Sequence, residues 1–427
     1  MIQFQSMINK YMRSYRIEIK PNKTQLQLIK QSCDVARFAY NWMLGKKIAE
    51  RESLISLAKM WDLDKVPSIH GTFFDWNKEW AKYKKDKDWI TSVSKCCGQM
   101  ALRDLEVSFK RFFSKKSKFP RFKKKGSKDS FKFDGQVFID YNTIQIPVIG
   151  KIKLKECGYA TDKRLRLSSA RISRDVDRWF VSFFIKDNLV IKDLPSINEI
   201  TKNDIIGVDL GIKELAITSD GETFENPKAY QKYLKRLKRY QRSVSRKQKG
   251  SNNRKKAVLK LGRLHRKIKN VRKDAIHKLT TSVVKTKPKL IVLETLKTKN
   301  MIKNHNLAGS ISDASFGEIR SQFEYKSLWN GVHLIKAPQF YASSKFCSCC
   351  GKKNEKLKLS DREWTCQNCN THHDRDVNAA QNLKFFGLWI LNKNTVSYTG
   401  INASGDERLQ FLTEQCSSMK LEFESKK

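Results

Sequence analysis

The chain has 427 residues, which predicts two to four domains when length is used as a soft guide. Lys and Arg number 86 against 43 Asp and Glu, a formal net charge of +43, which favours a DNA or RNA partner over a merely basic soluble protein. No apolar run reaches about 18 residues, which excludes a membrane span. Glycine-rich phosphate-binding motifs are absent from the sequence, so nothing in it supports an ATP-driven motor.

The cysteines and the amino-terminal residues indicate a reducing compartment. Ten cysteines, four of them in closely spaced pairs, suit metal binding better than disulfides in a chain of this size. The opening sequence MIQFQSMINKYMRSYR lacks the apolar core of a secretory signal. We therefore expect a cytoplasmic, nucleoid-associated protein that binds nucleic acid.

The amino-terminal part predicts one strand followed by helices. Residues 14–20 alternate as in a strand and stop at Pro21-Asn22, a turn signal. Thr24 is predicted to cap a long helix, and another helix is expected over about 91–114. The apolar face of that second helix is formed by Leu102, Leu105, Phe109 and Phe112.

Basic residues interleave with phenylalanines over residues 111–128. Such a segment can neutralise phosphates and stack on bases, which favours nucleic-acid contact for the charges. For the phenylalanines, stacking on bases and packing into the core are equally good interpretations.

A period of two follows over residues 130–187, where short apolar segments are separated by turn residues. The pattern predicts an antiparallel barrel or curved sheet. The strand at 14–20 is expected to join it, so that the helices of 24–124 are an insertion.

A second group of strands begins at residue 205. Asp209 lies on the first strand, and Asp220-Gly221 predicts a hairpin turn. Residues 228–286 are predicted to be helical with a break at 250–253. Between Glu225 and Asp274 there is no acidic residue against 20 Lys and Arg, so the arm is expected to present a positive ridge. The arm's packing stripe is Leu261, Leu264, Ile268 and Val271.

The remaining elements bring two further acidic positions. A buried strand ends at Glu294, and another strand is expected over 331–338. An apolar helix follows Asp376. The tail from about 391 is predicted to be poorly ordered and dispensable for chemistry.

Four cysteines have the spacing of a zinc ribbon. The pattern C-x2-C-x15-C-x2-C can present four thiolates tetrahedrally, and a closed site of this kind is structural rather than catalytic. The predicted ligands of one zinc ion are Cys347, Cys350, Cys366 and Cys369. Cys349 is predicted to be a spectator, and no ligand role is expected for Cys33, Cys96, Cys97, Cys157 and Cys416.

Asp209, Glu294 and one of Asp374 and Asp376 are candidates for a second kind of metal site. Each lies on a strand, at a strand end or before a helix, and an RNase H-like sheet brings such positions together. Hard carboxylates are the ligands that hold paired magnesium ions for phosphodiester hydrolysis. Each acid alone is weak evidence, because a strand-end carboxylate is usually a solvated cap.

Several segments together resemble the TnpB family, insertion-sequence proteins related to the type V CRISPR effectors. YRIEIKPNKTQ and RFAYNWML resemble the opening of the family, and FKRFFSKKSKFPRFKKK resembles its GFPRFK segment. GVDLGIKELAITSDG, LIVLETLKTKNMIKN, and the ribbon with HHDRDVNAAQNL resemble the three RuvC motifs in order. Thr295 and Ser404 depart from residues common in the family, and neither departure removes a metal ligand.

The resemblance implies RNA-guided, magnesium-dependent cleavage of double-stranded DNA beside a short adjacent motif. It implies two magnesium ions held by Asp209, Glu294 and Asp376, because the family's third acid lies two residues before the asparagine that is Asn378 here. The expected partners are a guide RNA from the end of the mobile element and target DNA, with no membrane and a monomer favoured.

The implied fold class is a multidomain α/β protein: an RNase H-like RuvC nuclease domain with an inserted zinc ribbon, and an antiparallel β-barrel wedge domain with a helical recognition insertion. The expected ranges are the wedge at 1–20 and 125–190, the recognition lobe at 21–124, the nuclease domain at 200–340 and 373–390 with its arm at 228–286, the ribbon at 341–372, and a flexible tail at 391–427.

Two other functions remain open. One is a metal-dependent transposase that joins DNA ends itself, since such enzymes share this kind of acidic triad. The other is a non-cleaving, RNA-guided or nucleic-acid-binding regulator in which the acids are incidental. No His-hydrophobic-His pair is present, which disfavours a tyrosine transposase acting on single strands.

Overall fold

The computed structural model describes residues 12–61, 71–158, 160–186, 193–339, 341–358 and 360–392. The chain divides into two compact units, Met1–Leu189 and Val190–Lys427, and each is described by itself. The predicted flexible tail lies outside the described residues, apart from its first two positions. Within the described residues no helix has the length and apolarity that a membrane span requires.

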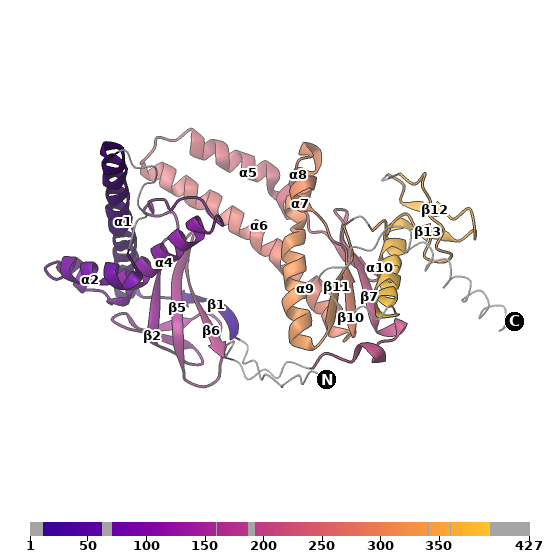
Figure 1. Cartoon of the computed structure of the whole chain (residues 1–427), viewed down its shortest axis with the longest axis horizontal. Coiled ribbons are helices and arrows are strands. Elements are labelled where there is room, and N and C mark those ends of the chain that lie inside the picture. Colours follow the sequence, from indigo (N-terminus) through magenta and orange to yellow (C-terminus); the bar gives the residue numbers. More distant parts are fainter. Residues whose placement is uncertain are drawn as a thin grey trace. The chain divides into compact units, whose positions relative to one another are not determined.

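The first unit contains the predicted antiparallel barrel (Figure 1). Its strands close in the order β1-β4-β3-β2-β5-β6, and the early strand β1 joins by pairing with β6 and β4. The interior is apolar because alternate residues point inward, among them Ile17, Phe133 and Phe183. The bounds are β1 (Met12–Lys20), β2 (Ser130–Ile139), β3 (Thr143–Ile146), β4 (Gly150–Leu154), β5 (Leu165–Asp175) and β6 (Arg178–Lys186).

Among the described residues between β1 and β2 lie four helices: α1 (Lys23–Met60), α2 (Phe73–Tyr83), α3 (Asp88–Thr91) and α4 (Cys96–Phe113). The prediction of Thr24 as the cap of α1 is wrong. Asn22 caps it, since its Oδ1 accepts from the Gln25 N–H at 2.8 Å while the Gln25 side chain accepts from the Asn22 N–H at 3.0 Å. This reciprocal pair satisfies two otherwise unpaired backbone donors, which a cap at Thr24 would leave open.

The phenylalanines of the basic segment 111–128 divide between the two interpretations. Phe119 packs against the core of the first unit, whereas Phe113 and Phe122 are exposed. The segment is held to α1 by Asn41, whose side chain donates to the Lys123 carbonyl and accepts from the Lys123 N–H.

The second unit is built on a five-stranded sheet of order β11-β10-β7-β8-β9. Strand β10 runs parallel to β7 and β11, while β8 runs antiparallel to β7 and β9. Its strands are β7 (Ile205–Asp209), β8 (Glu214–Thr218), β9 (Thr223–Glu225), β10 (Leu290–Leu293) and β11 (His333–Lys336). The predicted hairpin turn is present, with Gly221 at a φ of 86°.

Helices cover both faces of this sheet (Figure 1). One face of β7 and β10 packs against α10 (Arg375–Asn392), and the other packs against α6 (Asn252–Lys285) and α9 (Phe316–Asn330). Shorter elements complete the unit: η1 (Ile197–Glu199), η2 (Lys202–Asp204), α7 (Thr298–Met301) and α8 (His305–Ala314). A two-stranded ribbon, β12 (Glu363–Thr365) with β13 (His372–Asp374), precedes α10.

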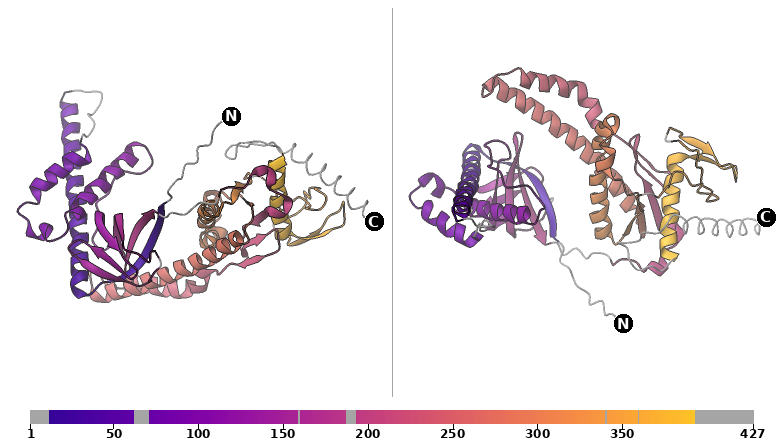
Figure 2. Two further views of the ribbon diagram at one scale, coloured as in Figure 1. Left: turned by 90° about the horizontal axis from the view of Figure 1, so that it is seen from below. Right: turned by 45° about the horizontal axis from the view of Figure 1, so that its top comes forward.

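The predicted basic arm is the pair α5 (Ala229–Ser245) and α6, which run side by side (Figure 2). Its predicted stripe is the packing seam, where Leu264 and Ile268 are buried and Leu261 and Val271 are partly buried. At the base, the buried Asp313 carboxylate accepts from Arg272 at 2.8 Å and from the Tyr230 N–H at 2.8 Å.

Candidate functional site

Two of the predicted acidic residues end neighbouring parallel strands. Asp209 is the last residue of β7, and Glu294 directly follows β10. Val208 and Leu293 are paired in the β7–β10 register, so the two acids emerge side by side at one edge of the sheet. The predicted third acid, Asp376, lies in the first turn of α10.

Two glycines allow α10 to lie close enough to bring Asp376 to that edge. A Cβ on Gly207 would stand 2.0 Å from the Ala380 carbonyl oxygen, so the α10 backbone rests directly on β7. A Cβ on Gly387 would stand 2.7 Å from Val292 of β10. Neither glycine tolerates a side chain without moving the helix that carries Asp376.

The acidic residues form an electrostatically unfavourable cluster. Burial raises the pKa of Asp209 well above its usual value, and the charges of Glu294, Asp376 and Asp374 raise it further. Burial also raises the pKa of Glu294 to about 6. These shifts mean that the folded chain holds carboxylates where their negative charge is poorly solvated, which is the situation a bound cation relieves.

Arginines occupy both oxygens of Asp376. Arg375 donates to Oδ1 at 3.1 and 3.2 Å, and Arg362 donates to Oδ2 at 3.0 Å. Arg362 comes from the segment just before β12, so the ribbon touches the acidic cluster directly. Sequence reasoning missed this residue because its partner lies 14 positions away, with the second cysteine pair between them.

The structure gives Asp374 a different task. Its Oδ1 accepts from the backbone N–H groups of Asp376 and Val377, both at 2.9 Å, as an N-cap of α10 does. Of the two candidates left open by residue type, Asp374 is therefore occupied as a helix cap, and Asp376 projects from the helix itself.

The four predicted zinc ligands converge. Among the described residues, one set of three or more potential ligands has all its donor atoms within 4.8 Å of one another, and it is formed by Cys347, Cys350, Cys366 and Cys369. The Sγ separations are 3.6 Å for Cys347–Cys369 and 3.5 Å for Cys350–Cys366. Thiolates about 2.3 Å from a tetrahedral zinc ion would lie roughly 3.8 Å apart, so the set fits zinc. Cys349 is exposed and outside the set.

The environment of the thiols is uneven. Burial raises the pKa of Cys347. For Cys369 burial acts in the same direction, but hydrogen bonds from Thr371 outweigh it and lower its pKa to about 6. The buried His373 Nε2 lies 3.0 Å from Cys347 Sγ, and its ring contacts Trp364 at a tilt of 38°. His373 is thus placed to orient a ligand of the ribbon.

Two buried asparagines join the cysteine cluster to α10. Asn378 Oδ1 accepts from the Ser348 N–H at 2.9 Å, and its Nδ2 donates to the Phe346 carbonyl at 2.7 Å. Asn382, one turn later, donates to the same carbonyl at 2.7 Å. The first cysteine pair is therefore tied to the helix two residues beyond Asp376. The signal for this link was two asparagines four positions apart in an otherwise apolar helix.

Three family models match separate parts of the chain. Residues 190–305 match a family described as a "Probable transposase" (OrfB_IS605), and residues 316–383 match the Cas12f1-like TNB domain. Residues 7–53 match a helix-turn-helix model of the same OrfB group. Over the described part of that last range, the structure has one strand and the beginning of one long helix.

Curated relatives cover most of the chain. A Streptomyces pristinaespiralis protein described as a proposed RNA-guided DNA endonuclease is 39% identical over 320 residues, 73% of this chain and 75% of its own length. The chain belongs to the TnpB family. A second TnpB relative, InsQ of Escherichia coli K12, carries the same description and is 30% identical over 90% of this chain and 94% of its own. A solved structure of the mini-RNA-guided endonuclease CRISPR-Cas_phi3 covers 93% of this chain and 94% of its own, with 11% identity and a TM-score of 0.40, too low to add to the assignment.

Proposed function

We propose that this TnpB-family protein is the RNA-guided DNA endonuclease of a mobile element, and that it hydrolyses both strands of target DNA at one magnesium-dependent site. The observation that carries the proposal is that Asp209 and Glu294 end neighbouring paired strands, and that the charge of Asp376, in the first turn of α10, acts on Asp209. Membership of a family whose relatives are described as RNA-guided endonucleases supports the choice of substrate.

The sheet supports an RNase H-like RuvC domain. Its antiparallel run β7-β8-β9 is extended by the parallel strands β10 and β11, with helices on both faces. In such a sheet the ends of β7 and β10 lie at the same edge, where an acid on the following helix can reach them. The insertion of a cysteine cluster directly before that helix fits the match to the TNB domain over residues 316–383.

Asp209, Glu294 and Asp376 would hold two magnesium ions, and the set fits because all three are hard carboxylates and the raised pKa values of Asp209 and Glu294 indicate poorly solvated negative charge. Magnesium supplies Lewis-acid stabilisation of the scissile phosphate and an activated water when bound. The carboxylates fix the position of that chemistry at the sheet edge. To offer its oxygens, Asp376 must give up its contacts with Arg375 and Arg362.

The cysteine cluster would hold one zinc ion as a structural element. All four donors come from the protein, so no position is open for water or substrate. The asparagine contacts transmit the rigidity of this module to α10, and hence to Asp376.

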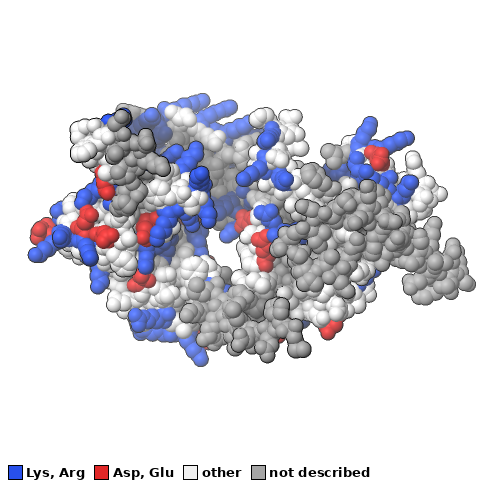
Figure 3. Space-filling view, in the orientation of Figure 1, with Lys and Arg blue, Asp and Glu red and all other residues white. Residues whose placement is uncertain are grey.

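The charge of +43 is consistent with a guide RNA and target DNA as partners of a single copy of the chain. On the face seen in Figure 3, Lys and Arg predominate over Asp and Glu among the described residues. A polyanion of the size of a structured RNA offsets such a surplus more effectively than a short duplex.

The test is purification from cells that also express the DNA flanking the gene. We expect one defined RNA to copurify, and the complex to cut DNA matching that RNA in magnesium. Asp209→Ala, Glu294→Ala and Asp376→Ala should each abolish cutting while RNA binding stays. Cutting that survives these changes would contradict the triad assignment. Protein that lacks a defined RNA yet joins DNA ends would identify a transposase, and RNA-bound wild type that never cuts would identify a regulator.

A further inference from the structure

We propose that a notch between α5 and α6 is a binding site for an RNA strand, which it holds by successive phosphates and at least one ribose hydroxyl. The inference rests on the proposed RNA partner and goes beyond it by naming the residues. The notch has a volume of about 570 Å³, within the range of about 300–1,000 Å³ that ligand sites occupy. It is lined by Arg239, Tyr240, Ser243, Lys247, Asn253, Lys256, Ala257 and Lys260.

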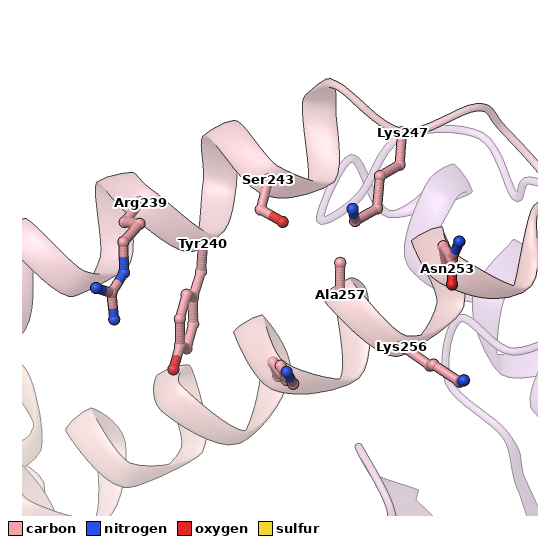
Figure 4. A pocket seen from close by; sticks show the side chains of 8 residues that line it. Arg239, Tyr240, Ser243, Lys247, Asn253, Lys256 and Ala257 are labelled. Atoms are coloured by element: carbon pink, nitrogen blue, oxygen red, sulfur yellow. The ribbon is translucent and has the colours of Figure 1, made fainter.

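The shape of the notch follows from where the two helices carry large and small side chains. Figure 4 shows Arg239, Tyr240 and Ser243 of α5, and Lys247 just beyond the end of that helix, projecting toward α6. Opposite them α6 presents Ala257, whose methyl group is buried and leaves the space unfilled. Nearer the base of the arm, leucines and isoleucines close the same seam, so the opening is confined to the end that adjoins the connection between the helices.

The notch is strongly positive. Four of its eight lining residues are cations and none is acidic. Among the described residues, no carboxylate pairs with Arg239, Lys247, Lys256 or Lys260, in contrast to Arg272 at the base of the arm, which pairs with Asp313. Cations gathered without counter-charge repel one another, and a bound chain of phosphates relieves that repulsion.

The neutral residues favour RNA over DNA. Lys and Arg donate hydrogen bonds but cannot accept them, whereas the Tyr240 and Ser243 hydroxyls and the Asn253 amide can do both. A ribose 2′-hydroxyl also donates and accepts, so it finds partners here that a deoxyribose cannot use.

Tyr240 adds a surface for a base. Arg236 donates to its hydroxyl at 3.1 Å, and the guanidinium groups of Arg236 and Arg239 lie 5.3 and 5.7 Å from the ring centre. The ring is thereby held in place beside the cations, which suits stacking by an unpaired base.

The experiment compares two triple variants of the full-length protein that lose the same charge. One removes notch cations, Lys247→Gln with Lys256→Gln and Lys260→Gln. The matched control removes exposed lysines of the same two helices outside the notch, Lys235→Gln with Lys238→Gln and Lys269→Gln. Affinity is measured over a salt series for a single-stranded RNA of mixed sequence and for the DNA strand of that sequence.

We expect the notch variant to bind RNA about tenfold or more weakly than the control variant. The slope of log affinity against log salt concentration should also become shallower, by up to about two units more in the notch variant than in the control. DNA binding should fall by a similar, smaller factor in both variants. Equal losses of RNA binding in the two variants would overturn the proposal, because only the total charge would then matter. An equal loss of DNA and RNA binding in the notch variant would overturn the choice of RNA.

A charge-neutral variant guards against helix unfolding as the cause. Ala257→Met fills the notch with a good helix former and leaves every cation in place. It should weaken RNA binding while circular dichroism shows unchanged helix content; unchanged RNA binding would contradict the proposal. Cleavage of matched DNA by the wild type separates this inference from the proposed function. Protein that binds RNA through the notch but never cuts DNA supports the notch and contradicts the nuclease.

Discussion

The second unit contains two clusters of candidate metal ligands, and they are built in opposite ways. The four cysteines lie with their sulfur atoms already at ligand spacing, two of them are buried, and His373 and Asn378 support the module. Among the acidic residues, Asp209 and Glu294 have raised pKa values, and arginines pair with Asp376.

The difference is the one expected between a proposed structural zinc site and a proposed catalytic magnesium site. A closed four-thiolate site stabilises the fold because its zinc ion, once bound, stays bound. A carboxylate site whose charges were already well compensated in the metal-free protein would gain little from binding a cation. The raised pKa values of Asp209 and Glu294 mean that a divalent cation bound there would relieve poorly solvated negative charge.

The largest effect on stability is expected from a substitution in the cysteine cluster. Cys366→Ser should release the zinc and unfold the ribbon, since such sites contribute roughly 10–16 kcal/mol of apparent binding energy to folding. Zinc content and thermal unfolding measure the loss. Cys349→Ser is the matched control, because Cys349 is exposed and outside the ligand set, and it should retain both zinc and stability.

The next largest effect on stability is expected at Asn378, which joins the cysteine cluster to α10. Asn378→Ala leaves the part-buried Ser348 N–H without its partner and should cost about 1–3 kcal/mol of stability. Zinc should also dissociate more readily, which a chelator competition measures. Gln381→Ala, on the same helix but bonded to the Ser219 carbonyl, should leave zinc release unchanged. Equal effects of the two substitutions would mean that Asn378 acts only through helix packing.

On the carboxylate side, removing a charge should stabilise the metal-free protein. Folding raises the pKa of Glu294 from 4.5 to about 6, so the folded state binds the proton more tightly than the unfolded state. Stability contributed by this group is present below pH 4.5 and is lost as the pH rises through about 6. Glu294→Gln should therefore match the wild type near pH 4 and exceed it by at most about 2 kcal/mol at pH 7.

Denaturant titrations in chelator at several pH values measure that difference. Magnesium should reverse its sign, because only the wild type offers the Glu294 carboxylate as a ligand. A Glu294→Gln protein that is less stable than the wild type at pH 7 in chelator would contradict the picture of a strained acidic cluster.

The smallest effect concerns Arg362, which competes with magnesium for Asp376. The side chain of Arg362 is 48% exposed, so the pair is worth at most about 1 kcal/mol. Arg362→Gln should tighten magnesium binding by at most about fivefold in the absence of DNA, seen as a shift in the magnesium-dependent melting temperature. Weaker magnesium binding in this variant would show that the arginine supports the site instead.

Much of this architecture could be predicted from local patterns. The period of two over 130–187 predicted the barrel, and cysteine spacing predicted the convergent thiols, because both depend on short-range regularity. The family resemblance selected the three acids, and the structure brings them to one sheet edge. Their role as metal ligands stays a prediction.

What could not be predicted depends on contacts between distant residues. Residue type alone left Asp374 and Asp376 open, and the capping role of Asp374 became visible only in the hydrogen bonds at the start of α10. Nothing local to Gly207 signals that a Cβ there would stand 2.0 Å from the carbonyl oxygen of Ala380, 173 positions later. Arg362 and Asn378 likewise act on partners that the chain brings near only after folding.

The most direct test that Asp376 belongs to a catalytic acidic site compares it with the neighbouring Asp374. Asp376→Asn and Asp374→Asn proteins, each loaded with the copurifying RNA, are assayed for cleavage of matched DNA in magnesium. Both substitutions are isosteric, and they differ in whether the residue belongs to the acidic site or caps α10. We predict no cleavage by Asp376→Asn and retained cleavage by Asp374→Asn, since asparagine is also a good helix cap. Cleavage by Asp376→Asn together with its loss in Asp374→Asn would contradict the assignment of Asp376 to the catalytic site.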